Sequence, residues 1–254
     1  MKLLCWTFVF AAACCACSRG ADIVAFETAP DGTTPVDDAL LSSSYSMTGG
    51  TIRFFYDKNG NNVYDASVDA FPAFEAAGRD AINAFATNWN DSSDTARAAY
   101  TAQLGNYFLR TAGSGNPSTL PPPPPGPFIA QCITSGTISG FSGELWYIDG
   151  GSNGGTEQWT IEVLDGSGNV LSSQLSPLGV DDSSSSLDGL PWTFTFSGMP
   201  ASAKSLRLNF IGSKMNGIGF AFNNFSVSVV PEPCCSILAA IFFACAACCR
   251  QRSR

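Results

Sequence analysis

Residues 155–176 read GTEQWTIEVLDGSGNVLSSQLS, and this stretch decides the fold class. Trp159, Ile161 and Val163 alternate with Thr160 and Glu162, which is the two-residue period of a β-strand with one buried face. The Gly- and Asn-rich segment 165–169 predicts a hairpin turn, and 170–175 predicts the returning strand. We therefore expect an antiparallel hairpin with Trp159 in the core.

The same pattern extends in both directions from this hairpin. From Phe128 onward, short apolar runs alternate with clusters of Gly, Asn and Ser, which predicts further strands at 192–196, 205–211 and 217–229. Upstream, DIVAFET (22–28) and GGTIRFFYD (49–57) predict two more strands. Regular short strands of this kind favour a mainly β protein, a single antiparallel β-sandwich of jelly-roll type.

One part of this region also resembles a known class of fold. The segment from GELWYID (143–149) to FAFNNFSV (220–227) is similar to the carbohydrate-binding-like β-sandwiches of exported bacterial proteins. Their final strand often carries two adjacent Asp or Asn residues between apolar positions, as Asn223 and Asn224 do here. The resemblance implies a sandwich fold, and it implies a ligand class only by analogy.

Residues 57–127 interrupt the strand pattern. Phe74, Ala77, Ala81, Ile82 and Phe85 fall at helical spacing, which predicts a helix over about 73–87, and a weaker helical segment follows at 95–104. Five consecutive prolines at 121–125 predict a polyproline II strap over 117–127. We expect one domain, 21–229, with 57–127 as an insertion. The alternative is two domains divided at the proline run.

Charge and composition narrow the function. The chain has 254 residues, of which 13% are charged, and it has no His, the commonest general base and pH switch. Five of its 13 basic residues lie at the two ends, so the stretch between them carries eight basic and 21 acidic residues, a net charge of −13. Phosphates would repel such a body, and we expect no nucleic-acid partner.

The ten Cys residues lie mainly at the ends of the chain. Four precede Ser18 and five follow Pro233, which leaves only Cys132 in the body. The body therefore has no internal disulfide. Because Cys132 lies within the apolar run FIAQCIT, we expect it to be a buried packing residue.

The N-terminal segment predicts export. Lys2 is followed by an apolar run at 3–13 and then by small residues up to Ala21, which is the pattern of a secretory signal peptide over 1–20. Lipoprotein processing at Cys14 or Cys17 and an uncleaved helix are the alternatives.

The C-terminal segment has the pattern of a second targeting signal. Residues 230–233 read VPEP, 234–249 are apolar, and 250–254 contain three Arg. This order resembles the PEP-CTERM sorting signal, in which Pro231, Glu232 and Pro233 would form the motif. The resemblance implies transient insertion of the apolar helix into the membrane and cleavage by an exosortase-type membrane protease. An uncut C-terminal anchor is the alternative.

The motif YDKNGNNVYDASVDA (56–70) predicts a calcium loop. Oxygen ligands at alternate positions wrap a hard cation, and one ligand is usually a backbone carbonyl. The candidate ligands are Asp57, Asn59, Asn61, the carbonyl of Val63, Asp65 and Asp69. Unlike an EF-hand, the loop has Asn62 at position six and Val68 at position twelve. A metal-free Asn/Gly turn is the alternative. By analogy with calcium-stabilised jelly rolls, Glu27 and Asn223 or Asn224 form a second candidate site.

Aromatic side chains suggest a sugar-binding surface. Trp146 and Tyr147 point to opposite faces of a strand, so one of them is a candidate for exposure and for stacking on a pyranose ring of an extracellular polysaccharide. The alternative is that these aromatic residues pack in the core and have no functional role.

Catalysis has little support in the sequence. The carboxylates near aromatic residues are Glu144, Asp149, Glu157 and Glu162, and they do not follow the closely spaced acidic pattern of jelly-roll glycosidases. Serine nucleophiles would lack a His to activate them. We therefore expect an exported, non-enzymatic surface or matrix protein that binds a ligand or builds structure. A secreted carbohydrate-active enzyme on a jelly-roll fold is the alternative.

Overall fold

The computed structural model describes residues 21–77, 96, 98–111, 124–150, 155–180, 187, 189–215, 218 and 220–230. The predicted signal peptide, the sorting motif with its apolar helix and basic end, residues 78–87 of the predicted helix and residues 117–123 of the predicted strap lie outside the described residues. Among the residues described, no helix is long and apolar enough to cross a membrane.

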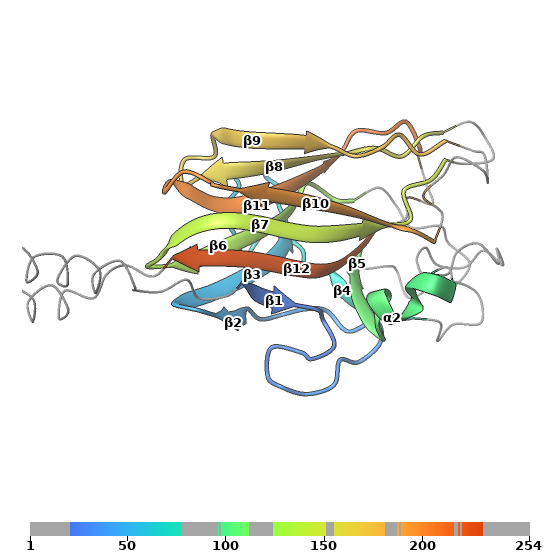
Figure 1. The fold of residues 1–254 in the computed structure, drawn as a ribbon, viewed down its shortest axis with the longest axis horizontal. Helices are drawn as coiled ribbons and strands as arrows, with labels where there is room; N and C mark the ends of the chain where they lie inside the picture. Colours follow the sequence, from blue (N-terminus) through green and yellow to red (C-terminus); the bar gives the residue numbers. More distant parts are fainter. Residues whose placement is uncertain are drawn as a thin grey trace, which may run out of the picture.

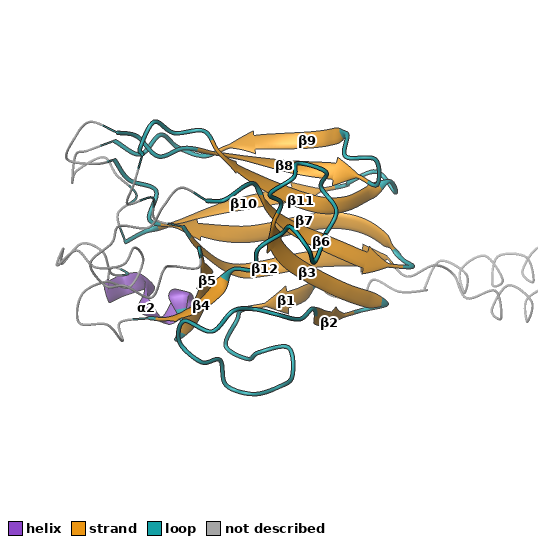
Figure 2. Ribbon diagram, turned by 180° about the vertical axis from the view of Figure 1, so that it is seen from behind, coloured by secondary structure: helices purple, strands orange, loops and turns teal. Residues whose placement is uncertain are grey.

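Two antiparallel sheets lie face to face, as Figures 1 and 2 show, and the protein is mainly β. The first sheet has the order β10-β7-β12-β5-β4, and β1 also pairs with β12. Its strands are β10 (Pro191–Ser197), β7 (Thr137–Trp146), β12 (Ala221–Val230), β5 (Tyr107–Arg110), β4 (Ala73–Ala76) and β1 (Asp22–Val24). The second sheet has the order β2-β3-β6-β11-β8-β9. Its strands are β2 (Tyr45–Met47), β3 (Gly50–Tyr56), β6 (Phe128–Thr134), β11 (Ala203–Phe210), β8 (Trp159–Asp165) and β9 (Val170–Leu175).

The hairpin predicted at 155–176 is confirmed. β8 and β9 pair as antiparallel strands, and the side chains of Trp159, Ile161 and Val163 are buried between the sheets. The turn that joins the strands is closed by the Asp165 carboxylate, which accepts hydrogen bonds from the backbone N–H groups of Ser167 and Asn169.

The N-terminal strands belong to the same two sheets as the later ones. β1 pairs with β12, with Asp22 opposite Val227, and β3 pairs with β6 along its whole length. β1 and β3 are therefore held by partners more than 70 positions away, whereas β2 forms a local hairpin with β3.

The helix predicted at about 73–87 is wrong at its start. Ala73–Ala76 form β4, which pairs with β5 and is buried at every position. Glu75 forms an ion pair with Arg110 of β5, and Arg110 also pairs with Asp38. The spacing of Phe74 and Ala77 suits a helix. The segment is a strand instead, because its backbone pairs with β5 and Glu75 pairs with Arg110 of that strand. The helical segment predicted at 95–104 is present as a single 3₁₀ turn, Ala98–Tyr100, followed by the one-turn helix α2, Thr101–Leu104.

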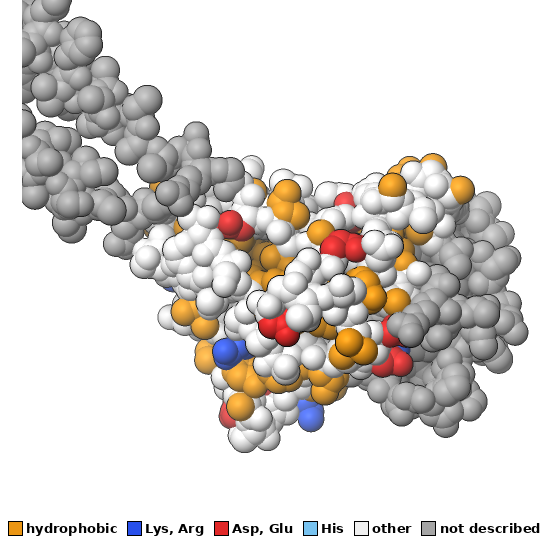
Figure 3. Space-filling view, turned by 90° about the horizontal axis from the view of Figure 1, so that it is seen from below, with side chains coloured by type: hydrophobic (Ala, Val, Ile, Leu, Met, Phe, Trp, Pro, Cys, Tyr) orange, Lys and Arg blue, Asp and Glu red, His pale blue; other side chains and the backbone are white. Residues whose placement is uncertain are grey.

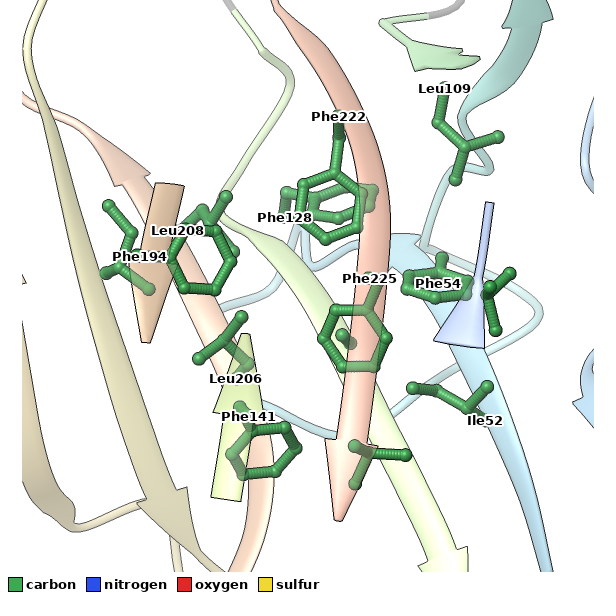
Figure 4. Packing of buried hydrophobic residues seen from close by; sticks show 14 of the residues in the cluster. Ile52, Phe54, Leu109, Phe128, Phe141, Phe194, Leu206, Leu208, Phe222 and Phe225 are labelled. Carbon is green, nitrogen blue, oxygen red and sulfur yellow. The ribbon is translucent and has the colours of Figure 1, made fainter. Parts of the chain in front are cut away.

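The core is largely aromatic, and Figure 4 shows Phe side chains from both sheets meeting between them. Phe54 of the second sheet lies 5.4 Å from Phe225 of the first, and Phe128 lies 5.0 Å from Phe222, both measured between ring centroids. Such pairs add about 1 kcal/mol beyond their buried area. Cys132 is buried beside them, as predicted, and burial raises the pKa of its thiol.

One face of the protein is poor in charge. On the face drawn in Figure 3, Lys, Arg, Asp and Glu are few and scattered among uncharged polar atoms and small apolar patches.

Candidate functional site

The predicted calcium loop folds back over the outer face of the second sheet, where a loop crosses the strands in Figure 2. Backbone hydrogen bonds between Tyr56 and Ala70 close it at its base. The Tyr64 ring lies 5.5 Å from Phe55 on β3, and the Arg53 guanidinium lies 4.3 Å from the centre of the Tyr64 ring. The loop therefore buries Phe55, although that side chain points away from the core between the sheets.

Asp57 organises the first half of the loop. Its side chain is only 1% exposed, and its carboxylate accepts hydrogen bonds from the backbone N–H groups of Gly60, Asn61 and Asn62 at 2.7–3.3 Å. Gly60 and Asn62 adopt positive φ angles, which Gly and Asn tolerate best. The sequence DKNGNN thus encodes a turn wrapped around one buried carboxylate.

Shorter turns of the same kind complete the loop. The Oδ1 atoms of Asn59 and Asn61 accept N–H groups two residues ahead, and Asp69 accepts the N–H groups of Lys58 and Asp65 through its two oxygens. Asp65 accepts both the N–H and the hydroxyl of Ser67, and the hydroxyl contact is the main cause of its lowered pKa.

This arrangement fits a turn stabilised by its own side chains. All five Asp and Asn side chains proposed as ligands bind backbone N–H groups of the loop, and Val63 has an exposed side chain. Within the described ranges, no group of three or more Cys, Asp or Glu is placed to hold a metal ion. A carboxylate oxygen that accepts one N–H group keeps a second lone pair, so calcium at this loop stays a prediction.

Beside the loop lies a groove of about 420 Å³, a volume within the usual range for small-ligand sites. One wall is 61–63 of the loop, and the opposite wall is the turn between β8 and β9. The floor comes from β6 and β11. The lining residues are Asn61, Asn62, Val63, Gln131, Cys132, Ile133, Thr134, Asp165, Gly166, Ser167, Gly168, Lys204 and Ser205.

A hydrogen bond fixes one wall of the groove, the loop, to the strand β11 of its floor. Arg207 of β11 donates from Nη1 to Oδ1 of Asn62 at 2.9 Å and forms an ion pair with Glu162 of β8 at 2.8 Å. The walls also approach each other closely, because a Cβ atom on Gly168 would lie 3.0 Å from the Asn62 amide nitrogen.

The groove offers mainly uncharged hydrogen-bonding groups. Amides and hydroxyls line it, together with one cation and one anion, and Val63 and Ile133 add exposed apolar contacts. Hydrogen bonds from Asn169 are the main cause of the lowered pKa of Asp165, which is therefore a stable anion at neutral pH. This chemistry suits a neutral ligand with many hydroxyl groups.

Sequence reasoning missed the groove. The alternation in FIAQCIT places Gln131 and Ile133 on the face opposite Phe128 and Cys132, which marks an outer sheet surface. The wall above that surface comes from a loop about 70 positions upstream, and no local pattern predicts that contact.

The predicted exposure of Trp146 or Tyr147 is wrong. Trp146 is 1% exposed and Tyr147 is 7% exposed, and both pack with Leu104 and Phe108. The Trp146 indole N–H also donates to Glu144 at 3.1 Å. The end of β7 is covered by the α2 turn, so neither ring offers an open face for a sugar.

Glu27, Asn223 and Asn224 contact one segment, 103–107, each through its own hydrogen bonds. The Glu27 carboxylate accepts the backbone N–H and the side-chain amide of Asn106. The amide groups of Asn223 and Asn224 donate to the carbonyls of Leu104 and Gln103. These side chains thus bind protein donors and acceptors, and a cation at this place stays a prediction.

The four carboxylates considered for catalysis are held by other side chains. Glu144 accepts hydrogen bonds from Gln103, Trp146 and Asn224. Glu162 pairs with Arg207, as described above. Asp149 and Glu157 both contact Lys214.

Fold and groove together define an antiparallel two-sheet β-protein with a polar groove on one outer face. No protein-family model matches the chain, and no curated protein does. Two solved structures that do match are the enzymatically active domain of tailspike protein 4 from bacteriophage CBA120 and the K1 cleaved adhesin domain of Lys-gingipain from Porphyromonas gingivalis W83. Each is 14% identical to this chain.

The matches cover 74% of this chain and 19% of the tailspike chain at a TM-score of 0.27, and 70% of this chain and 98% of the adhesin domain at 0.30. This chain thus spans about a fifth of the tailspike chain. At these scores neither likeness carries a functional argument.

Proposed function

We propose that this protein is an exported, non-enzymatic binding module of the cell surface or extracellular matrix, and that its groove binds a neutral polysaccharide. The groove carries the proposal, because its amide and hydroxyl lining provides donors and acceptors for sugar hydroxyls without a strong field of either sign. The body is a sandwich of jelly-roll type, and the loop 57–69 takes up calcium as a structural ion.

The sequence at the two ends supports the location. Residues 1–20 have the pattern of a signal peptide, and 230–254 have that of a PEP-CTERM tail. β12 ends at Val230, immediately before the Pro231-Glu232-Pro233 motif, so the proposed sorting signal begins where the sandwich ends. An exosortase-type membrane protease is the proposed partner for its removal.

Affinity electrophoresis and calorimetry against a panel of soluble polysaccharides test the binding. Gln131→Ala removes an amide from the groove floor, and Gln174→Ala removes a matched strand amide from β9, outside the groove. We expect the first change to weaken binding about fivefold to tenfold, the value of one hydrogen bond, and the second to leave it unchanged.

The same panel separates the alternatives. Saturable binding without release of sugar supports the module, whereas turnover would identify a carbohydrate-active enzyme. Binding that both Gln variants weaken equally would place the ligand elsewhere. The absence of any binding would leave a structural role.

A further inference from the structure

Three titratable side chains meet at the end of the sandwich opposite the β8–β9 turn, far from the groove. The Nζ atom of Lys214 lies 2.7 Å from Oδ1 of Asp149 and 2.9 Å from Oε1 of Glu157. The side chains are 12%, 16% and 0% exposed, respectively. An amine, a carboxyl carbon that it could attack and a fully buried second carboxylate are thus held together with little exposure to water.

The backbone fixes this meeting. Asp149 follows β7 of the first sheet, whereas Glu157 precedes β8 and Lys214 follows β11, both in the second sheet. The N–H of Glu157 donates to the carbonyl of Asp149 at 3.0 Å, and the N–H of Lys214 donates to the carbonyl of Thr156 at 3.1 Å. The three side chains are therefore positioned by hydrogen-bonded backbone.

Two glycines make room for this approach. A Cβ atom on Gly179 would lie 2.4 Å from the carbonyl oxygen of Asp149, and one on Gly155 would lie 2.9 Å from the Cα of Lys214. Any larger residue at either position would push the cluster apart.

Tyr147, next to the cluster, has a strained backbone. It is a non-glycine residue at φ 64°, a conformation that costs about 1 kcal/mol or more. The Lys214 Nζ atom lies 5.9 Å from the centre of its ring. Strain of this kind is concentrated where a local geometry serves a function.

Burial shifts the ionisation of the two reacting groups. Burial is the main cause of the raised pKa of Asp149, and it outweighs the opposing effect of Lys214. Burial alone would lower the pKa of Lys214, but Glu157 and Asp149 together reverse that effect.

We propose that Lys214 and Asp149 form an intramolecular isopeptide bond, with Glu157 as the catalytic proton carrier. The ammonium of Lys214 passes a proton to Glu157, and the freed nitrogen lone pair forms a bond to Cγ of Asp149. The C–O bond to one Asp149 oxygen then breaks, and its electron pair leaves with that oxygen. Protons from nitrogen and from Glu157 complete one water molecule. One ammonium and one carboxylate thus become one amide and one water, and no external reagent is needed.

The local structure favours this reaction over simple ion pairing. Holding amine and carboxyl in contact replaces a bimolecular encounter with an intramolecular one, worth several orders of magnitude in rate. The low exposure of the three side chains disfavours the charged pair and the reverse hydrolysis. The product would join the two sheets covalently in a body that has only Cys132 and hence no internal disulfide. This inference goes beyond ligand binding and does not depend on it.

Peptide mapping of the purified full chain tests the proposal. After digestion under reducing conditions, tandem mass spectrometry should find the segments that carry Asp149 and Lys214 joined, at the sum of their masses minus one water. Trypsin should no longer cleave after Lys214. Asp149→Ala and Lys214→Arg should each abolish the linked peptide.

Glu157→Gln tests the proton carrier, because it keeps both reacting groups. We expect the linked peptide to be absent or to form at least tenfold more slowly. Glu162→Gln is the matched control on β8, since it also removes a carboxylate paired with a cation, and it should leave the link intact. Near-ultraviolet circular dichroism reports whether each variant folds.

The wild-type result decides the proposal whatever the variants do. Unlinked Asp149 and Lys214 peptides from folded wild-type protein would overturn the bond and leave a buried ion-pair cluster. A link that forms at the wild-type rate in Glu157→Gln would overturn the role of Glu157.

Discussion

Oδ1 of Asn62 accepts a hydrogen bond of 2.9 Å from Nη1 of Arg207, across 145 positions of sequence. The bond ties the loop 57–69 to β11, and Arg207 extends the connection to Glu162 on β8. One wall of the groove is thereby fixed to its floor. The loop is held by the sheet as well as by its own turns, and its anchor can be tested.

Asn62 contributes both a hydrogen bond and a tolerance for positive φ. Asn62→Gly should lose only the bond, at a cost of about 1 kcal/mol, because Gly adopts φ 60° without strain. Asn62→Ala should cost about 1 kcal/mol more. Urea unfolding measures both values. Equal stability of the two variants would contradict a strained left-handed position.

The buried carboxylate of Asp57 should be the most sensitive residue of the loop. Asp57→Ala leaves the N–H groups of Gly60, Asn61 and Asn62 without their acceptor, and we expect a loss of about 2–3 kcal/mol. Asn59→Ala, at an exposed position of the same loop, should cost well under 1 kcal/mol. Thermal or denaturant unfolding compares them, and similar losses would argue against Asp57 as the organising residue.

Calcium should stabilise the protein if the loop binds it. Calorimetric titration should give saturable heat, and a roughly hundredfold excess over Kd should add about 2.7 kcal/mol to the free energy of unfolding. Asn59→Ala and Asn61→Ala together should abolish this response, whereas Gln174→Ala, on β9 and outside both candidate cation sites, should retain it. No heat and no melting shift at millimolar calcium would exclude the ion.

Acid should destabilise the fold through its turn carboxylates. The pKa values of Asp65 and Asp165 are lowered by hydrogen bonds, chiefly with Ser67 and Asn169, respectively. A lowered folded pKa contributes stability above the unfolded value of about 3.9, and that stability is lost as pH falls through the folded pKa. Unfolding experiments from about pH 6 down to about pH 2 should show a decrease. Asp165→Asn should make that decrease smaller, and an unchanged slope would contradict the assignment.

The native ends of the protein test the export proposal. Mass spectrometry of material from cells and medium should find a new N-terminus near Ala21 and a C-terminus near the Pro231-Glu232-Pro233 motif. Replacing Pro231 and Pro233 with Ala should keep the C-terminal tail attached, whereas replacing Pro200, in a surface turn of the body, should not. A cytosolic chain running from Met1 to Arg254 would refute this account.

The sequence predicts those strands that have one face buried. Trp159, Ile161 and Val163 alternate with half-exposed residues, so the pattern is readable from the sequence. β4 is buried on both faces, and its Glu75 is held by Arg110 about 35 positions later. A strand of this kind has no two-residue period, and the apolar spacing around it favours a helix instead.

The sites were less predictable than the strands. The Asn and Gly residues of 57–69 favour turns through their local conformational preferences. The sequence therefore predicts the loop at the residues where the structure has it. The groove and the Lys214 cluster each join segments more than 50 positions apart. Whether an aromatic side chain is exposed depends on distant contacts of this kind as well. Trp146 is buried because the α2 turn covers the end of β7, which its neighbours in sequence do not reveal.

β12 is the central strand of the first sheet, with β7 on one edge and both β5 and β1 on the other. Because it continues directly into the residues before Pro231, any pull on that tail acts along the strand. Such a pull would load all the backbone hydrogen bonds between β12 and its neighbours β7, β5 and β1 in shear. These bonds would have to break together instead of one at a time. A protein tethered through this end would resist mechanical extraction from a surface. The first sheet could also form completely only after the chain had been synthesised and exported as far as Val230, the last residue of β12.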